Sequence, residues 1–435
     1  MTGQKKSGPL TERVHGVAML QQLGPGLITG AADDDPSGIA TYSQAGAQSG
    51  FNLLWTMVLT FPLMVSIQMI SAQIGRVTGH GLARNMGDVL PRPWVKILVA
   101  LLFLANTVNV GADLAAMGEA ARLATGITKD GIGQHAFTIF FALFSLGLQL
   151  FIPYRRYARF LTVLTLSLLA YVAIVFMVPL PWTEIGAGLV GMHPGLNEDA
   201  AMLIVAIFGT TISPYLFFWQ SAQEVEEVEQ KNARRPLIDA PRQARSAFAR
   251  IRLDTIAGML VSNLIALAII ISTAATLHAA GKTNIQTAAD AAVALEPIAG
   301  HFAFMLFAVG IIGTGLLAIP VLAGSAAYAV GESLGWKTGL DNMPWQARGF
   351  YGVIGAAVIL GLGIDYSPID PIKALVWSAV LNGVIAVPIM AAMMMVASSK
   401  KKMGQFRVGW LLGGLGWTTA AMMAAATITM IYVSL

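Results

Sequence analysis

The stretch LGPGLITGAADDDPSGIATYSQAG, residues 23–46, places three consecutive carboxylates inside an apolar, glycine-rich segment. They are Asp33, Asp34 and Asp35, and Pro36 follows them directly. A carboxylate in the middle of a hydrophobic segment is costly, so such groups usually face a partner or a water-filled path. Proline lacks a backbone donor and interrupts a helix. The stretch therefore predicts a broken membrane helix with a cation site at the break.

The composition supports a membrane location for the whole chain. Of its 435 residues 56% are apolar and 11% are charged, with a mean hydropathy of +0.67, which predicts a polytopic protein in a lipid bilayer. Because the chain has no cysteine, disulfides, thiolate metal ligands and cysteine nucleophiles are excluded. We expect no nucleic-acid partner, no cofactor and no enzymatic activity. The polar first fifteen residues do not resemble a signal peptide.

Apolar segments of spanning length predict an all-α polytopic membrane protein with eleven transmembrane helices. Their boundaries fall at about 17–45, 52–74, 95–124, 135–153, 158–180, 200–228, 253–277, 302–330, 349–364, 373–397 and 408–434. With the N-terminus in the cytoplasm, all but four of the 27 Lys and Arg residues fall on the cytoplasmic side. The exceptions are Arg122, Lys129, Lys282 and Lys373. This asymmetry predicts a multi-pass protein of a bacterial inner membrane with a cytoplasmic N-terminus.

A second break is predicted at Ser213-Pro214, within IFGTTISPYLFFWQ of the sixth span. Five spans separate the two prolines, so the two five-helix halves have opposite orientations. Matching interruptions in two inverted repeats indicate a transporter binding site. The alternative, that both prolines only kink helices, leaves the three acids unexplained. We expect one transporter domain over 1–435, with repeat one at about 17–180, repeat two at about 200–397 and an accessory span at about 408–434.

The residues at the two breaks offer oxygen ligands. Asp35 is the first predicted ligand, and Ser213 and Thr210 add hydroxyl or freed carbonyl oxygens. Hard oxygens suit Mg²⁺, Ca²⁺ or Mn²⁺. Adjacent helical residues diverge by about 100°, so Asp33 and Asp34 cannot both point the way Asp35 does. Asp34 is a further candidate ligand and Asp33 a candidate path residue, unless they only cap the break or face water.

Polar positions elsewhere in the spans are candidates for an ion path. Asn106, Asn109 and Asp113 share one helix face, which fits either a path or an interhelical contact. Asn382 shares a face with Ser378, where a buried hydrogen bond is the favoured interpretation. Glu224 is a candidate exit acid, and the glutamates after it are expected to be solvated. The predicted path residues are Asp33, Asp113, Gln220, Glu224 and Asn382.

Two motifs resemble those of a known family. GPGLITGAADDDPSGIAT is similar to the first-span signature of the NRAMP divalent metal transporters, whose core reads Asp-Pro-Gly-Asn. GTTISPYLFFWQ is similar to their sixth-span motif around Met-Pro-His-Asn. The resemblance covers spans one to ten and implies the inverted-repeat fold with broken helices 1 and 6. It also implies a metal held by the first-span Asp and Asn, a sixth-span Met and a nearby carbonyl.

Matched to this sequence, the family's Asp is Asp35, its Asn is Gly38, its Met is Ser213 and its carbonyl donor is Thr210. A sixth-span His linked to proton transfer becomes Gln220, and the third-span acidic pair keeps only Asp113. The lost thioether favours Mn²⁺ and Fe²⁺ over hard ions. The chain therefore resembles the family's Mg²⁺-associated branch more than its proton symporters, although Asp33 and Asp34 belong to neither pattern.

We predict a secondary transporter whose substrate is a divalent cation, Mg²⁺ or Mn²⁺, moved by alternating access with weak or no proton coupling. A symporter of the same fold for an organic solute or anion is the alternative. The aspartates disfavour an anion unless a cation or proton neutralises them. A receptor or scaffold is a third class, with little soluble surface beyond a basic loop of roughly 20 residues.

Overall fold

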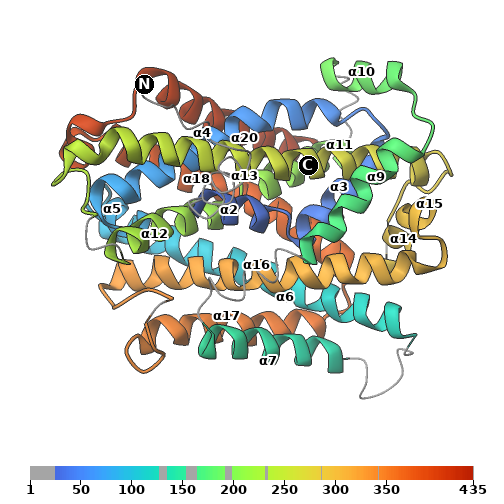
Figure 1. The fold of residues 1–435 in the computed structure, drawn as a ribbon, viewed down its shortest axis with the longest axis horizontal. Coiled ribbons are helices and arrows are strands. Elements are labelled where there is room, and N and C mark those ends of the chain that lie inside the picture. The colour runs from blue at the N-terminus through green and yellow to red at the C-terminus, as the bar shows by residue number, and fades with distance from the viewer. Residues whose placement is uncertain are drawn as a thin grey trace, which may run out of the picture.

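The computed structural model describes residues 25–126, 135–152, 164–191, 198–230, 234–285, 287–340 and 342–434. Within these ranges the chain is helical and contains no strand (Figure 1). Several predictions fall outside the described residues. They concern the missing signal peptide, the starts of the first and fifth spans, and the basic residues Lys5, Lys6, Arg13, Lys129, Arg155, Arg156, Arg159 and Lys231.

Both predicted breaks are confirmed. Helix α2 (Pro25–Asp33) and helix α3 (Pro36–Ser49) are separated by two residues, Asp34 and Asp35. Helix α11 (Glu198–Thr211) and helix α12 (Pro214–Gln230) are separated by Ile212 and Ser213. Each proline is the first residue of the second helix, where its missing N–H costs no helical hydrogen bond.

The remaining spans agree with the hydropathy pattern. The described residues contain eight helices long and apolar enough to cross a membrane, or nine if one bent pair is counted as a span. The all-helical membrane class is therefore confirmed, but not the number of eleven spans. Besides the α11–α12 pair, the long helices are α4 (Leu54–Thr78), α6 (Arg92–Thr125), α13 (Ala244–Thr273), α16 (Ala303–Leu334), α17 (Arg348–Asp365), α18 (Pro371–Ser398) and α20 (Trp410–Ser434), with the shorter apolar α7 (Ala136–Phe151).

Short helices connect the spans. A π-helical turn (Ala274–His278) extends α13, and α9 (Leu169–Met177) is part of the fifth predicted span. Helix α10 (Trp182–Val190) was not predicted. The chain bends by 120° between it and the preceding helical segment, Leu166–Met177. The other short helices are α5 (Leu82–Gly87), α10 (Trp182–Val190), α14 (Ala288–Ala292), α15 (Glu296–Ala299) and α19 (Lys400–Met403).

The long helices pack in two groups, which are separated vertically in Figure 1. One group contains α6, α7, α16 and α17, in which α6 packs along α16 and α17. The other contains α4, α12, α13 and the broken α2–α3 pair. Helix α18 contacts α6, α11 and α3, so it joins the groups, and α20 covers α18 and α4. The first break therefore lies within the second group, which also contains the helix that follows the second break.

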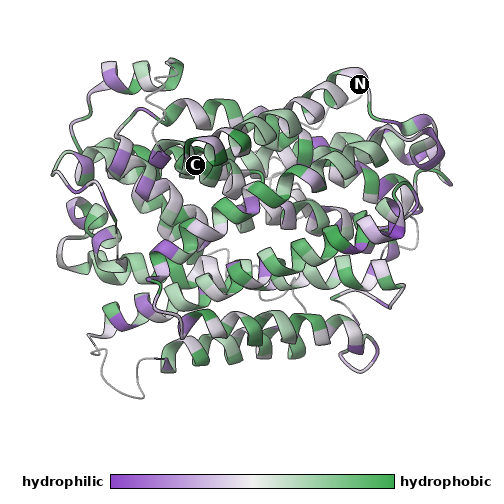
Figure 2. Cartoon of the chain, turned by 180° about the vertical axis from the view of Figure 1, so that it is seen from behind, coloured by the Kyte–Doolittle hydropathy of each residue, from purple (hydrophilic) through white to green (hydrophobic). Residues whose placement is uncertain are grey.

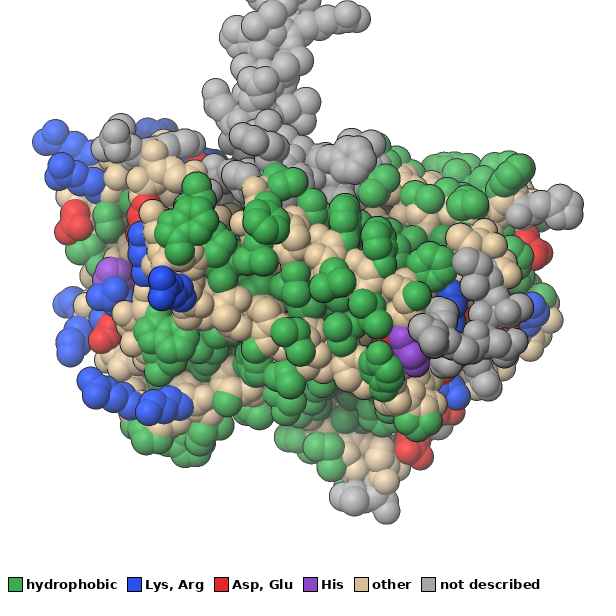
Figure 3. All heavy atoms as spheres, turned by 90° about the horizontal axis from the view of Figure 1, so that it is seen from below, with side chains coloured by type: hydrophobic (Ala, Val, Ile, Leu, Met, Phe, Trp, Pro, Cys, Tyr) green, Lys and Arg blue, Asp and Glu red, His purple; other side chains and the backbone are tan. Residues whose placement is uncertain are grey.

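Polarity follows the long dimension of the molecule. Apolar residues dominate the middle of the long helices, and hydrophilic residues concentrate near the two ends (Figure 2). Lys and Arg side chains gather at the end where α4 stops and α6 begins (Figure 3). We call this the basic end; it includes Arg76, Arg84, Arg234, Arg250 and Lys402. Large apolar side chains on the flanks are exposed, among them Leu143, Ile359 and Trp377, as a lipid-facing surface requires.

Candidate metal site

Asp35 lies where the two broken helices meet. As the N-cap residue of α3, its carboxylate accepts the backbone N–H of Gly38 at 2.8 Å and the hydroxyl of Ser37 at 2.6 Å, both at Oδ1. Its Oδ2 accepts the Tyr215 hydroxyl at 3.1 Å and the Asn109 amide at 3.2 Å. The carboxylate is 1% exposed. Four donors therefore surround it, and the positive end of the α3 dipole further stabilises its charge.

The contacts of Asp35 continue to a fourth helix. Asn109 of α6 accepts the hydroxyl of Ser378, from α18, at 2.7 Å between Oδ1 and Oγ. Its amide therefore points its nitrogen at Asp35 and its oxygen at Ser378. Asn109 therefore makes an interhelical contact beside the first break, and Ser378 makes the buried hydrogen bond that was the favoured interpretation of its face. Asn106, one turn before Asn109, instead bonds Leu322 and Ser325 of α16.

At the second break the hydroxyl of Ser213 turns back onto its own helix. It lies 2.8 Å from the carbonyl oxygen of Gly209 and 2.7 Å from that of Thr210. Two of the oxygens predicted as ligands, the Ser213 hydroxyl and the Thr210 carbonyl, thus bond to each other. The Thr210 hydroxyl is 1% exposed and has no hydrogen-bond partner among the described residues. It is the available oxygen at this break.

Gly38 faces the Thr210 hydroxyl across the two breaks. A Cβ at this position would lie 3.2 Å from Thr210 Oγ1 and 3.3 Å from Cε2 of Tyr42. The Tyr42 hydroxyl is 3.1 Å from that of Thr211. Glycine therefore supplies no side-chain ligand here, and its small size lets α3 approach α11 closely.

Asp33 and Asp34 point to a different helix from Asp35. One hydroxyl, that of Ser262 in α13, lies 2.7 Å from Asp33 Oδ2 and 3.0 Å from Asp34 Oδ1. Both acids are buried, at 1% and 4% exposure. The predicted divergence of the three aspartates is confirmed. The Asp35 carboxylate bonds residues of α6 and α12, whereas Asp33 and Asp34 bond a residue of α13.

The path candidates Asp113 and Asn382 are fully buried near this centre. Asp113 lies one turn beyond Asn109, and Asn382 lies one turn beyond Ser378. Neither oxygen of Asp113, and neither polar atom of the Asn382 side chain, has a hydrogen-bond partner in the described part of the chain. Buried polar atoms rarely remain unpaired, so these two positions are suited to water or a passing ion.

The other two path candidates lie toward the basic end. Gln220 accepts the Thr29 hydroxyl at 2.5 Å, which ties α12 to α2. Glu224 forms an ion pair with Arg250 of α13 at 2.5 Å between Oε2 and Nη2. Arg250 also contacts Glu227 at 3.0 Å and Asp254 at 3.3 Å. Glu224 is therefore part of a buried charge cluster, rather than a lone acid.

The prediction that the later glutamates of α12 are solvated is wrong for two of them. Glu226 is 8% exposed and accepts the Tyr328 hydroxyl and the backbone N–H of Leu340, the latter at 2.9 Å. Glu227 is 6% exposed and pairs with Arg234 at 2.7 Å as well as with Arg250. The long apolar run before them gave no sign that loops fold back over the end of α12.

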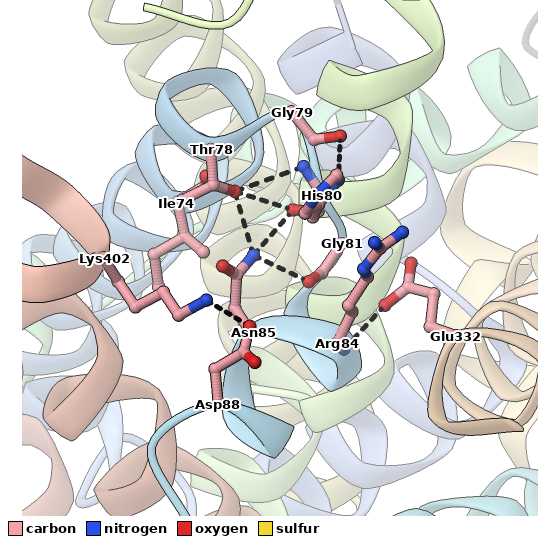
Figure 4. Close-up of polar contacts among 10 residues, drawn as sticks. All are labelled: Ile74, Thr78, Gly79, His80, Gly81, Arg84, Asn85, Asp88, Glu332 and Lys402. Carbon is pink, nitrogen blue, oxygen red and sulfur yellow. Dashed lines mark hydrogen bonds and ion pairs between the residues drawn. The ribbon is translucent and has the colours of Figure 1, made fainter. Parts of the chain in front are cut away.

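A further contact at the basic end ties α16 to α5, the short helix between α4 and α6 (Figure 4). Glu332, near the end of α16, accepts the backbone N–H groups of Ala83 at 3.1 Å and Arg84 at 3.4 Å, in the first turn of α5. Asn85 holds the preceding turn through Thr78 and the carbonyls of His80 and Gly81. With the Arg250 cluster, this contact ties helices together at the basic end.

Several residues of the centre carried no signal in the sequence. Ser262 is one hydroxyl in a long apolar helix, and Tyr42 and Arg250 read as a core aromatic and a loop cation. For Tyr215, the only indication in the sequence was its position directly after Pro214. Among the described residues no group of three or more His, Cys, Asp or Glu side chains could hold a metal ion. A cation at the breaks therefore depends on hydroxyl, amide and carbonyl oxygens as well as carboxylates.

Two broken helices meeting around buried carboxylates define a polytopic membrane protein of the inverted-repeat transporter fold. Solved structures share this fold. A manganese transporter from Eremococcus coleocola, in complex with an aromatic bis-isothiourea substituted compound, has a TM-score of 0.72 at 16% identity, covering 98% of this chain and 88% of that one. Mhp1, a nucleobase-cation-symport-1 family transporter in a closed conformation, has a TM-score of 0.58 at 14% identity, covering 95% and 93%.

The sequence comparisons identify the family. Residues 26–433 match the family model described as natural resistance-associated macrophage protein-like, so the chain belongs to the Nramp family. A divalent metal cation transporter MntH from Klebsiella pneumoniae is 26% identical over 421 residues, covering 93% of this chain and 92% of the relative. One from Yersinia pestis is 29% identical over 307 residues, covering 68% and 69%. The resemblance seen in the two motifs is confirmed.

Proposed function

We propose that this protein is a secondary transporter that moves a divalent cation, Mg²⁺ or Mn²⁺, through the centre formed by its two broken helices. Membership of the Nramp family and the divalent metal cation transporters among its relatives support the substrate class. The observation that carries the proposal is the position of Asp35. It is a buried carboxylate at the end of one break, bonded to Tyr215 at the start of the helix after the other.

The available ligands favour a hard cation. The centre offers carboxylates from Asp33, Asp34 and Asp35 and the hydroxyls of Thr210 and Ser213, with no Met sulfur at the position that the family uses. Oxygen-only donor sets suit Mg²⁺ and Mn²⁺, and the missing thioether weakens discrimination against Mg²⁺. Because Gln220 stands where the family's sixth-span His is found, tight proton coupling is not expected.

The closed basic end fits one state of an alternating-access cycle. At that end Glu226 of α12 accepts the Tyr328 hydroxyl of α16, and Glu332 of α16 accepts backbone N–H groups of α5. Movement of one group against the other would break these contacts and open the centre to that side. The concentration of Lys and Arg there supports a basic end that faces the cytoplasm of a bacterial inner membrane, and the same rule favours a cytoplasmic N-terminus.

Liposome flux tests this proposal. Purified protein in proteoliposomes should admit Mg²⁺ and Mn²⁺, and Asp35→Asn should lower the rate at least about tenfold because it removes the carboxylate that both breaks share. Tyr432→Phe, an exposed position on α20, is the matched control and should keep the wild-type rate. No divalent flux in the wild type, or flux unchanged by Asp35→Asn, would contradict the proposal.

A further inference from the structure

Two elements of the basic end carry exposed cations that have no acidic partner among the described residues. One element is the first third of α13, and the other is the loop 399–409, which contains α19 and joins α18 to α20. Their exposed, unpaired cations are Arg245, Arg252, Lys400, Lys401 and Arg407. By contrast, Arg250 and Lys402 of the same elements form ion pairs. The surface of these elements therefore carries positive charge that the described protein does not neutralise.

An aromatic contact joins the two elements. The rings of Phe248 and Phe406 meet edge to face, with 5.8 Å between their centroids. Arg245 and Arg252 lie three residues before and four residues after Phe248, so they share its face of α13. Arg407 directly follows Phe406 in the sequence. The contact therefore brings cations of both elements close together.

Packing fixes the loop that carries Arg407. Met403 is fully buried, and the backbone N–H of Val408 donates to a carbonyl in the last turn of α18 at 3.3 Å. Lys402 forms an ion pair with Asp88, in the turn after α5. The position of Arg407 relative to α13 is therefore set by contacts on both sides of it along the chain.

The cations lie at the depth of phospholipid headgroups. The apolar part of α13 runs from Leu253 to Thr273, which at 1.5 Å per residue is about 30 Å, the thickness of the hydrocarbon core. Its one charged residue, Asp254, is buried and paired. Arg252 therefore marks the boundary of the hydrocarbon. Trp410, 88% exposed at the start of α20, has the position and exposure typical of an interfacial anchor.

Toward the middle of the membrane the same side of α13 is apolar and uncovered. Ile256 and Leu260 follow Arg252 at spacings of four and eight residues, and both are exposed. A soluble anion would use the cations alone, because it has no apolar part to place on these side chains. A phospholipid would use the cations and the apolar surface together.

We propose that Arg245, Arg252 and Arg407 bind the phosphate of an anionic phospholipid, whose acyl chains lie along the exposed apolar side of α13. Guanidinium groups recognise phosphate oxygens through paired hydrogen bonds, in a lipid headgroup as in a free phosphate. The unpaired cations favour a lipid with net negative charge over a zwitterionic one. Because α13 packs on both α2 and α3, the lipid occupies the outer side of a helix that positions the first break.

Native mass spectrometry of the purified full-length protein tests this site. The protein is incubated with phosphatidylglycerol and phosphatidylcholine of the same acyl chains at equal concentration, and the wild type should retain phosphatidylglycerol in preference. The triple variant Arg245→Gln, Arg252→Gln and Arg407→Gln should lower the ratio of the two bound lipids at least about tenfold, because each cation near an anionic surface contributes about fivefold. All three side chains are exposed, so the variant should melt at the wild-type temperature in detergent.

A second triple variant, Lys96→Gln, Lys337→Gln and Arg348→Gln, is the matched control. It removes the same charge from exposed positions at the basic end outside these two elements, and it should change the lipid ratio less than about twofold. An equal fall in both triple variants would show that overall charge selects the lipid, and this would overturn the site. Equal retention of the two lipids by the wild type would overturn it as well.

Inorganic phosphate distinguishes a lipid from a soluble anion. Added in excess, it should leave the bound phosphatidylglycerol in place, because the apolar contacts of the lipid remain. Displacement of the lipid by phosphate would assign the cations to a soluble anion and overturn the proposal. None of these measurements depends on metal flux, so a failure of the proposed transport function would leave the lipid site standing.

Discussion

The hydroxyl of Tyr215 donates a hydrogen bond of 3.1 Å to Oδ2 of Asp35, joining the second residue of α12 to the last residue of the first break. The donor occupies a lone pair that a metal ion would use, and Asn109 occupies another position on the same oxygen. Binding of a cation to Asp35 therefore requires that protein donors leave. The bond ties the first break to α12.

Replacing Tyr215 by Phe should make divalent cations bind more tightly. Loss of the competing donor frees Oδ2, and a hydrogen bond to a charged group contributes about 1.5 kcal/mol, so the Kd for Mn²⁺ should fall roughly tenfold. Isothermal titration of Mn²⁺ into purified protein measures this, with Tyr432→Phe as the control. A higher Kd would show that the hydroxyl is itself a ligand or orients one.

Asn109 and Ser378 should act as one unit. The Ser378 hydroxyl reaches Asp35 only through Oδ1 of Asn109, so its effect should vanish when Asn109 is removed. In a cycle of Asn109→Ala, Ser378→Ala and the double variant, the Mn²⁺ Kd should show a coupling energy of about 1 kcal/mol. If the two substitutions change the free energy of Mn²⁺ binding additively, Ser378 contributes only to the packing of α18.

The outline of the fold was predictable because hydropathy and proline are local signals. Asp35-Pro36 and Ser213-Pro214 interrupt long apolar runs, and both predicted breaks lie where the helices stop. The helix period also grouped Asn109 with Asp113, and Ser378 with Asn382, on shared helix faces, but left open whether those faces line a path or form interhelical contacts. These statements need only the sequence within one span and the spacing of its polar residues.

The partner of each acid was not predictable. Ser262 lies 229 residues from Asp33, and its contact depends on the register of α2 against α13, set by Gly30 and Gly258. The burial of Glu226 and Glu227 depends in the same way on loops that fold back over α12. Such contacts arise from tertiary packing, which no pattern within a single span contains.

Gly38 should not accept the asparagine that the family resemblance places there. A Cβ would lie 3.2 Å from Thr210 Oγ1 and 3.3 Å from Tyr42, so Gly38→Asn should destabilise the protein by about 1–3 kcal/mol through overpacking. Adding Thr210→Ala should recover part of the loss by removing the hydroxyl. Thermal unfolding in detergent measures both, and Gly87→Asn, where nothing lies within 4 Å, is the control. Equal melting temperatures for Gly38→Asn and wild type would refute the steric argument.

Arg250 should hold the basic end closed. It is the cation between Glu224, Glu227 and Asp254, so Arg250→Gln leaves buried carboxylates uncompensated and should cost about 3 kcal/mol of stability. It should also expose the centre from that side. Because the chain has no native cysteine, Thr255→Cys is a unique reporter on α13, buried in the closed state.

A membrane-impermeant maleimide applied from the basic side should label Thr255→Cys faster in the Arg250→Gln background than in the wild-type background. Arg348→Gln, an exposed cation at the start of α17, supplies the control background and should leave the labelling rate unchanged. Slow labelling in all three backgrounds would mean that the Arg250 cluster stabilises the fold without closing a path.

Ser213→Met should shift the preference of the transporter from Mg²⁺ toward Mn²⁺. The substitution removes the hydroxyl that bonds the carbonyls of Gly209 and Thr210, and it introduces a soft thioether beside the freed oxygens. A change of about 1.4 kcal/mol in relative binding, or roughly tenfold in the Mn²⁺ to Mg²⁺ flux ratio, should follow. Competition flux in proteoliposomes gives the ratio. Ser213→Ala frees the same carbonyls without the sulfur, so it should keep the wild-type ratio; a shift as large as that of Ser213→Met would assign the selectivity to the carbonyl oxygens instead.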